Sequence, residues 1–229
     1  MQEIPAIYGL FRRINKSLAA VLFTPVMVVA EPLSVLALGD SLTQGYGLPV
    51  QQGFVPQLQG WLAIEGQQVE VINGGVSGDT TTGGLARIAW SLSSEPDALI
   101  VALGGNDLLR GIDPALSKRN LAGIMEAAQN ADVPVLLVGI GVPNNYGLAY
   151  KQAFEAMYPA LAQRYSTLYV ADFLAALKDT SSLKIGLLPQ FMQADGLHPN
   201  SVGVQKIVGT LGPSVLMLIA LAKQNRAPD

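Results

Sequence analysis

Five short, almost continuously apolar runs alternate with longer segments of helical periodicity, and this alternation constrains the fold more than any other feature. The apolar runs span residues 33–38, 69–73, 98–103, 133–140 and 167–170. Runs of this kind are typical of strands that are buried on both faces of a sheet. The helical segments span residues 54–65, 81–92, 114–130, 150–164 and 201–223. Strands that alternate with helices form right-handed βαβ units, so the sequence predicts an α/β domain with a doubly wound, parallel, five-stranded sheet.

The N-terminal segment differs in character from the rest of the chain. Basic residues precede an apolar stretch at residues 18–29, and Val28 and Ala30 are small residues suited to cleavage before Glu31. This pattern predicts a signal peptide over residues 1–30, and hence a periplasmic or secreted protein. The apolar stretch is shorter than the roughly 20 residues that a membrane span needs, so no stable span is expected after cleavage. An uncleaved anchor or a buried helix is the alternative.

Residues 31–229 are predicted to form one domain because no repeat or linker interrupts them. The composition of the chain excludes several classes of function. The full chain has a net charge of −3 and no basic block beyond the N-terminal segment, which does not favour a nucleic-acid partner. The chain has no cysteine, which excludes disulfides and thiolate catalysis, and its single histidine argues against a zinc site. No feature points to an obligate protein partner.

Glycine-rich or polar motifs follow the first four predicted strands, at residues 39–41, 74–80, 104–107 and 141–147. Ligands of doubly wound sheets bind beyond the carboxyl ends of the strands, so these motifs are expected to meet at one rim. None of them matches a phosphate loop or a dinucleotide fingerprint. Residues 179–194 are predicted to be a loop and a candidate lid over that rim.

Ser41 and His198 are candidates for nucleophilic catalysis. His198 is the only histidine, so any Ser–His mechanism has a single candidate base. Ser41 is predicted to begin a helix, where backbone N–H groups favour developing negative charge. Asp195 lies three residues before His198 and can orient its imidazole. Each motif alone also fits a plain turn, with His198 packed beside Pro199. Asp40 is predicted to organise its loop as a hydrogen-bond acceptor rather than to act as a catalytic acid.

Acyl transfer also requires donors for a tetrahedral oxyanion, each contributing roughly 3–4 kcal/mol to the transition state. The turn at residues 73–80 can expose backbone N–H groups, and the motif at residues 104–107 can direct the Asn106 side-chain amide inward. Each glycine cluster, taken by itself, favours a plain turn that has no catalytic role.

Four segments together resemble the conserved blocks of the SGNH/GDSL hydrolase superfamily. They are Gly39-Asp40-Ser41-Leu42, Val76-Ser77-Gly78-Asp79-Thr80, Gly104-Gly105-Asn106-Asp107 and Asp195-Gly196-Leu197-His198-Pro199. Their order and approximate spacing match across essentially the whole chain after residue 30. Within the superfamily the chain is most similar to the periplasmic thioesterase I, arylesterase and lysophospholipase subgroup, which residues 108–111 and 142–147 also fit.

The resemblance implies that Ser41 is the nucleophile, His198 the base and Asp195 the residue that orients it. The oxyanion hole maps to the backbone N–H groups of Ser41 and Gly78 and to the side chain of Asn106. The resemblance further implies a flavodoxin-like, three-layer α/β/α fold and a reaction without metal or cofactor.

Substrate contacts also follow from the resemblance. In the subgroup, the segment that corresponds to residues 141–146 lines the acyl pocket. Tyr146 is therefore predicted to contact the substrate. Gly78 and Asn106, which belong to the implied oxyanion hole, are predicted to contact it as well.

The sequence thus predicts a serine esterase or thioesterase that acts on short to medium acyl esters through an acyl-enzyme on Ser41. Aryl esters, acyl thioesters and lysophospholipids are the candidate substrates. A carbohydrate or peptidoglycan O-acetylesterase of the same superfamily is the alternative, although aromatic residues, which could form a sugar-binding platform, make up only 7% of the chain. A non-catalytic scaffold domain is the alternative from another class, and the presence of all three candidate catalytic residues disfavours it.

Overall fold

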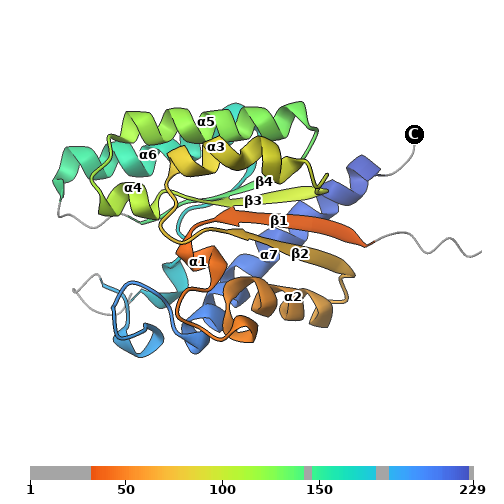
Figure 1. The fold of residues 1–229 in the computed structure, drawn as a ribbon, viewed down its shortest axis with the longest axis horizontal. Coiled ribbons are helices and arrows are strands. Elements are labelled where there is room, and N and C mark those ends of the chain that lie inside the picture. Colours follow the sequence, from red (N-terminus) through yellow and green to blue (C-terminus); the bar gives the residue numbers. More distant parts are fainter. Residues whose placement is uncertain (1–31, 142–145, 179–185, 227–229) are drawn as a thin grey trace, which may run out of the picture. The chain divides into compact units, whose positions relative to one another are not determined.

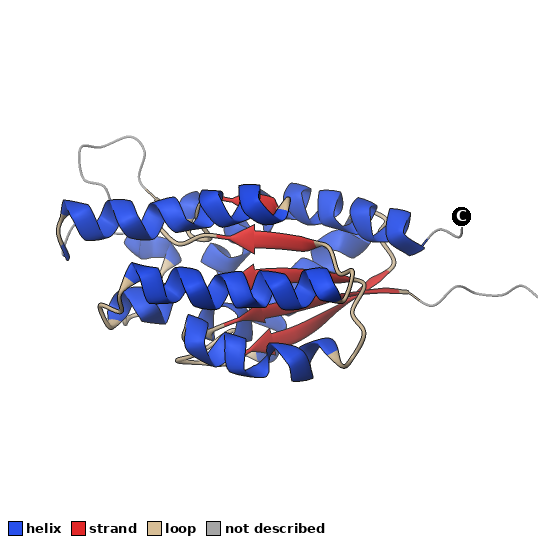
Figure 2. Ribbon diagram, turned by 90° about the horizontal axis from the view of Figure 1, so that it is seen from above, coloured by secondary structure: helices blue, strands red, loops and turns tan. Residues whose placement is uncertain are grey.

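A parallel sheet forms the centre of the molecule in the computed structural model, which describes residues 32–141, 146–178 and 186–226. Its strands are β1 (Leu33–Gly39), β2 (Val69–Gly75), β3 (Ala98–Ala102), β4 (Val135–Val138) and β5 (Leu168–Val170). They pair in the order β2-β1-β3-β4-β5, and every pairing is parallel (Figure 2). The predicted five-stranded, doubly wound sheet is confirmed. The predicted signal peptide lies outside the described residues.

Helices cover both faces of this sheet and complete the three-layer α/β/α arrangement (Figure 1). One layer consists of α3 (Thr81–Leu92), α5 (Pro114–Asn130) and α6 (Leu148–Tyr165), and the other of α2 (Phe54–Ile64) and α7 (Ser201–Arg226). Every residue of the two strands β3 and β4 is buried between these layers. This burial on both faces explains why the strands are apolar throughout rather than alternating.

Among the described residues, α7 alone is long and apolar enough to cross a membrane. Its side chains Ile207, Leu211 and Leu218 are buried, and the helix packs along strands β1, β3, β4 and β5. The apolar character of α7 is therefore accounted for by its place in the core.

Two short helices occur directly after strands, where they position side chains at the rim. Helix α1 (Ser41–Gln44) follows β1, as predicted from the position of Ser41, whereas α4 (Gly105–Leu109) after β3 was not expected. A helix as short as α4 spans little more than one turn, so hydrophobic periodicity cannot detect it. Strand β4 is shorter than the predicted run at residues 133–140.

Single turns of 3₁₀ helix make up the remaining elements: η1 (Val50–Gln52), η3 (Ala175–Leu177) and η4 (Pro189–Phe191). Element η4 falls in the predicted lid, of which residues 179–185 lie outside the described residues. The described part of that segment is held to the following turn by an antiparallel bridge between Met192 and Pro199. Closure over the site stays a prediction.

Candidate active site

One cavity of about 460 Å³ opens at the carboxyl ends of the strands. Ser41, Gly78, Asn106 and His198 all line it, although they come from four separate segments of the chain. The strands β1, β2 and β3 bring the first three to the rim, and the turn before α7 brings His198. Apolar side chains form much of the remaining wall, namely Leu42, Leu108, Leu109, Ile140, Leu174, Leu187 and Leu197.

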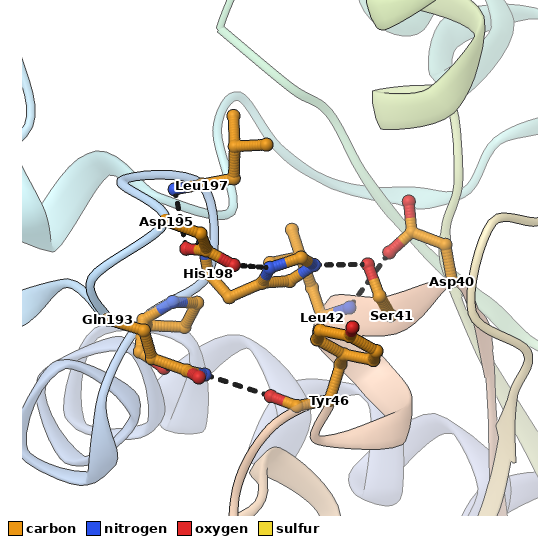
Figure 3. A network of polar contacts seen from close by, with 9 residues as sticks. Asp40, Ser41, Leu42, Tyr46, Gln193, Asp195, Leu197 and His198 are labelled. Carbon is orange, nitrogen blue, oxygen red and sulfur yellow. Dashed lines mark hydrogen bonds and ion pairs between the residues drawn. The ribbon is translucent and has the colours of Figure 1, made fainter.

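Asp195, His198 and Ser41 form a continuous chain of hydrogen bonds (Figure 3). Asp195 Oδ2 lies 2.6 Å from His198 Nδ1, and His198 Nε2 lies 2.9 Å from Ser41 Oγ. The residues proposed from distant parts of the sequence are thus in direct contact. Asp195 does not line the cavity but lies behind the imidazole.

The surroundings of Asp195 determine which imidazole nitrogen carries a proton. The hydrogen bonds from the His198 side chain and from the backbone N–H groups of His198 and Leu197 lower the pKa of Asp195 to about 2. At neutral pH this carboxylate is ionised and can only accept, so Nδ1 of neutral His198 must be the donor. Nε2 then has a free lone pair, which accepts the hydrogen bond from the Ser41 hydroxyl. In this arrangement the imidazole can remove the hydroxyl proton.

Two backbone N–H groups at the cavity are available to a ligand. Those of Ser41 and Gly78 have no hydrogen-bond acceptor within the described part of the chain. Gly78 has a φ of +80°, a conformation that L side chains rarely adopt, and Arg110 Nη2 donates to its carbonyl oxygen at 2.8 Å. The turn after β2 is therefore held in place from α4.

Asn106 adds a side-chain amide to the same cavity. Its Nδ2 lies 3.4 Å from Asp40 Oδ2, which is a long contact that leaves donor capacity for a ligand. The backbone N–H groups of Ser41 and Gly78 and this amide together provide three donors from residues that line the cavity. Such a set can stabilise negative charge on an oxygen bound there.

Asp40 organises the loop before Ser41, as predicted. Its Oδ1 accepts the Leu42 N–H at 3.0 Å and caps α1. Only 2% of Asp40 is exposed, and this burial raises its pKa to about 6, although the Leu42 and Asn106 hydrogen bonds and the nearby His198 act in the opposite direction. A carboxyl group that is costly to ionise thus lies beside the side chain of Asn106.

A second buried carboxylate, Asp107, connects three helices beneath the cavity. It is fully buried and accepts hydrogen bonds from the Thr81 N–H, the Thr81 hydroxyl and the Ser117 hydroxyl. Thr81 begins α3, Ser117 lies on α5, and Asp107 directly follows Asn106 on α4. These contacts place α4, and with it Asn106, relative to the turn that carries Gly78.

Tyr146 lies beside the cavity but is not among the residues that line it. Its hydroxyl donates to the carbonyl oxygen of Leu109, which does line the cavity, at 3.1 Å. Residues 142–145, which belong to the same predicted substrate-binding segment, lie outside the described residues. A substrate contact for Tyr146 therefore stays a prediction.

Two residues at the site were not predicted individually: Tyr46 was not singled out, and Gln193 fell only within the candidate lid at residues 179–194. The Tyr46 ring lies with its centroid 4.7 Å from that of His198, and Gln193 Nε2 donates to the Tyr46 carbonyl oxygen at 2.8 Å. Neither has a local pattern that separates it from other surface residues, so only the spatial contact reveals them. Within the described ranges, no three His, Cys, Asp or Glu side chains cluster as a metal site would require.

Comparison with known proteins places this geometry in a family. The chain is 39% identical over 191 residues to the esterase TesA of Pseudomonas aeruginosa, covering 83% of this chain and 91% of that relative. It is 37% identical over 166 residues to an arylesterase of Vibrio mimicus (72% and 79% covered). It is 36% identical over 169 residues to the thioesterase 1/protease 1/lysophospholipase L1 of Escherichia coli K12 (73% and 76% covered).

The fold of this chain is also similar to the folds of solved esterase structures. The crystal structure of TesA superposes with a TM-score of 0.72 at 38% identity, covering 81% of this chain and 99% of that one. The psychrotrophic esterase EstA from Pseudoalteromonas, crystallised with monoethylphosphonate as inhibitor, superposes with a TM-score of 0.73 at 29% identity, covering 82% and 98%. The model of the GDSL-like Lipase/Acylhydrolase family matches residues 37–206. The chain therefore belongs to the GDSL, or SGNH, family of hydrolases.

Proposed function

We propose that this protein is a serine esterase or thioesterase that cleaves short to medium acyl esters through an acyl-enzyme on Ser41. The observation that carries the proposal is the hydrogen-bonded chain from Asp195 through His198 to Ser41, which opens into a largely apolar cavity. The names of the relatives, which include an arylesterase and a thioesterase/lysophospholipase, support aryl esters, acyl thioesters and lysophospholipids as candidate substrates.

Acylation begins when the Ser41 oxygen attacks the acyl carbonyl carbon while its proton passes to His198 Nε2. The carbonyl π electrons move onto oxygen, and the Ser41 and Gly78 N–H groups and the Asn106 amide donate to the resulting oxyanion. Ionised Asp195 stabilises the imidazolium through Nδ1. When the intermediate collapses, the bond to the leaving alkoxide or thiolate breaks and His198 returns the proton to that group.

Deacylation repeats the sequence with water in place of the serine. His198 removes a proton from a water molecule, whose oxygen attacks the acyl carbon of the Ser41 ester. Collapse of the second oxyanion releases the carboxylic acid and restores the Ser41 hydroxyl with the proton held by His198. Asp195 stays ionised throughout.

The cavity dimensions support an acyl substrate. A volume of about 460 Å³ falls within the range of about 300–1,000 Å³ that is typical of small-molecule sites. Because leucine and isoleucine side chains form much of the wall, burial of an alkyl chain is favourable by about 0.8 kcal/mol for each methylene.

Substitution of the nucleophile tests the proposal. Ser41→Ala removes the attacking oxygen and is expected to abolish turnover of p-nitrophenyl acetate without changing the thermal unfolding temperature. A fluorophosphonate should label the wild-type protein at Ser41 and leave this variant unlabelled. Turnover by the alanine variant at a rate near that of wild type contradicts the assignment of the nucleophile.

A substrate panel separates the candidate reactions. Initial rates with p-nitrophenyl esters of increasing chain length, an acyl-CoA, a lysophospholipid and acetylated xylan are compared on one preparation. We expect the short to medium aryl esters and thioesters to be cleaved faster than acetylated xylan. The opposite order would favour the carbohydrate O-acetylesterase.

Export is the second part of the proposal. Residues 1–30 act as a cleaved signal peptide, and residues 31–229 form the mature hydrolase. N-terminal sequencing of protein recovered from the periplasm or the medium is expected to begin at Glu31. Recovery of the intact N-terminus in the membrane fraction would instead support an uncleaved anchor.

A further inference from the structure

Gln193 closes a ring of hydrogen bonds around the Ser41–His198 contact. Its backbone N–H donates to the His198 carbonyl oxygen at 2.8 Å, and its side-chain Nε2 donates to the Tyr46 carbonyl oxygen at 2.8 Å. The Tyr46 N–H in turn donates to the Ser41 carbonyl oxygen at 3.1 Å. The contact between Ser41 Oγ and His198 Nε2 is the remaining side of this ring (Figure 3).

The same side chain also stabilises the turn that carries the histidine. Nε2 of Gln193 donates a second hydrogen bond to the Pro199 carbonyl oxygen at 3.0 Å, so both amide hydrogens are used. The backbone carbonyl oxygen of Gln193 accepts the Gly196 N–H at 3.0 Å. Gln193 therefore contacts the histidine turn on two sides and the serine loop on a third.

The serine loop is shaped to admit this amide. Gly47 has a φ of +74°, and a Cβ at this position would lie 2.3 Å from Gln193 Oε1. The ring of Tyr46 lies at 38° to the imidazole, with the centroids 4.7 Å apart, so it covers one side of His198. Loss of the Gln193 amide removes the side-chain hydrogen bond that joins the loop of Ser41 and Tyr46 to the histidine turn.

We propose that Gln193 is a positioning residue for the hydrolytic reaction: by joining the serine loop to the histidine turn, its amide sets the distance between Ser41 Oγ and His198 Nε2. The inference rests on the proposed function, because it assumes that this contact transfers the proton. A displacement of about 1 Å between reacting groups can lower a rate by about 100-fold, so a single amide at this point has a measurable effect.

Gln193→Met tests the role, since methionine has a similar length but no donor. Gln57→Met is the matched control, because Gln57 Nε2 likewise donates to two carbonyl oxygens, those of Gln52 and Ser201, and does not line the cavity. We expect Gln193→Met to lower kcat for p-nitrophenyl acetate by about 10-fold or more with KM changed less than about twofold. The control should keep both constants within about twofold of wild type.

The single histidine provides a spectroscopic readout. All imidazole signals in the ¹⁵N NMR spectrum of the mature chain arise from His198. We expect the Nε2 resonance to shift in Gln193→Met, because the Ser41 hydrogen bond lengthens, and to match wild type in Gln57→Met. Loss of stability alone would not move this signal in the folded protein.

Labelling separates failure of this inference from failure of the proposed function. A wild-type protein that a fluorophosphonate does not label at Ser41 contradicts the proposed function itself. If wild type is labelled, and Gln193→Met is labelled at the same rate with an unshifted Nε2 signal, the positioning role is overturned. Should Gln193→Met fail to fold, Gln193→Asn replaces it, because the shortened amide cannot reach both carbonyl oxygens. A wild-type rate in that variant overturns the role as well.

Discussion

The Ser41 hydroxyl lies 2.9 Å from Nε2 of His198, although 157 positions separate the two residues in the chain. Ser41 is held at the first turn of α1, and His198 is held by the turn before α7. Because each is fixed by its own local structure, the contact depends on how the first strand and the last helix pack.

Asp195→Asn should lower kcat for p-nitrophenyl acetate by about 10⁴-fold, with little change in KM. An amide can donate to Nδ1, which leaves the proton on Nε2 and removes the lone pair that accepts from Ser41. Asp113→Asn, an exposed helix cap away from the cavity, is the control. A loss of less than tenfold would show that Asp195 does not select the imidazole tautomer.

Asn106→Ala should lower kcat by about 10²–10³-fold, because one of three oxyanion donors is removed. KM should change little, since the ground-state carbonyl oxygen interacts weakly with this donor. Steady-state kinetics on the same ester measure both constants. Asn225→Ala, which removes an amide that donates to the Asp132 carbonyl oxygen away from the cavity, is the control and should behave as wild type. Equal kcat values for the two variants would show that Asn106 is not a donor in the oxyanion hole.

Asp107→Asn should destabilise the fold by about 2–4 kcal/mol. The new amide group would face donors at Thr81 and Ser117, and at least one buried donor would lose its acceptor. Urea denaturation measures the free energy of unfolding. Asp113→Asn, which keeps a favourable cap residue, should change it by less than about 1 kcal/mol. If both variants unfold at the same urea concentration, the buried network does not carry the stability assigned to it.

Asp40→Asn should alter how stability depends on pH. Burial raises the pKa of Asp40 from 3.8 to about 6. Between these values the folded state keeps a proton that the unfolded state has released, so the contribution of Asp40 to stability falls as pH rises through this window. The variant lacks this titration. Wild type should therefore lose about 2 kcal/mol relative to the variant between pH 4.5 and pH 7.5.

The comparison uses urea unfolding of both proteins at the two pH values. Asp195 does not affect this comparison, because its pKa is lowered from 3.8 to about 2. Its contribution to the free energy of unfolding is lost only as the pH falls through that more acidic range. If the free energy of unfolding depends on pH in the same way for wild type and Asp40→Asn, burial does not raise the pKa of Asp40.

The arrangement of strands and helices could be predicted from the sequence because burial leaves a direct signature. Strands β3 and β4 are apolar at every position since both of their faces are covered, and helix α5 begins and ends where periodicity predicts. Ser41, Asn106, Asp195 and His198 could likewise be singled out from their residue types and from their places next to a strand end or a helix start. The assignment of Gly78 came instead from the resemblance of its segment to the SGNH/GDSL superfamily. Helix α4 was missed because its single turn has no period to detect.

The fold class, the candidate catalytic residues and the rim of the sheet at which they meet were predictable from the amino-acid sequence. Three contacts became visible only in the folded chain: Gln193 joins the serine loop to the histidine turn, Tyr46 covers the imidazole, and Asp107 holds three helices together. The raised pKa of Asp40 likewise could not be predicted from the sequence, because it results from burial by residues distant in the chain. Periodicity and motifs record local requirements, whereas these contacts arise only when separate segments are packed at defined distances.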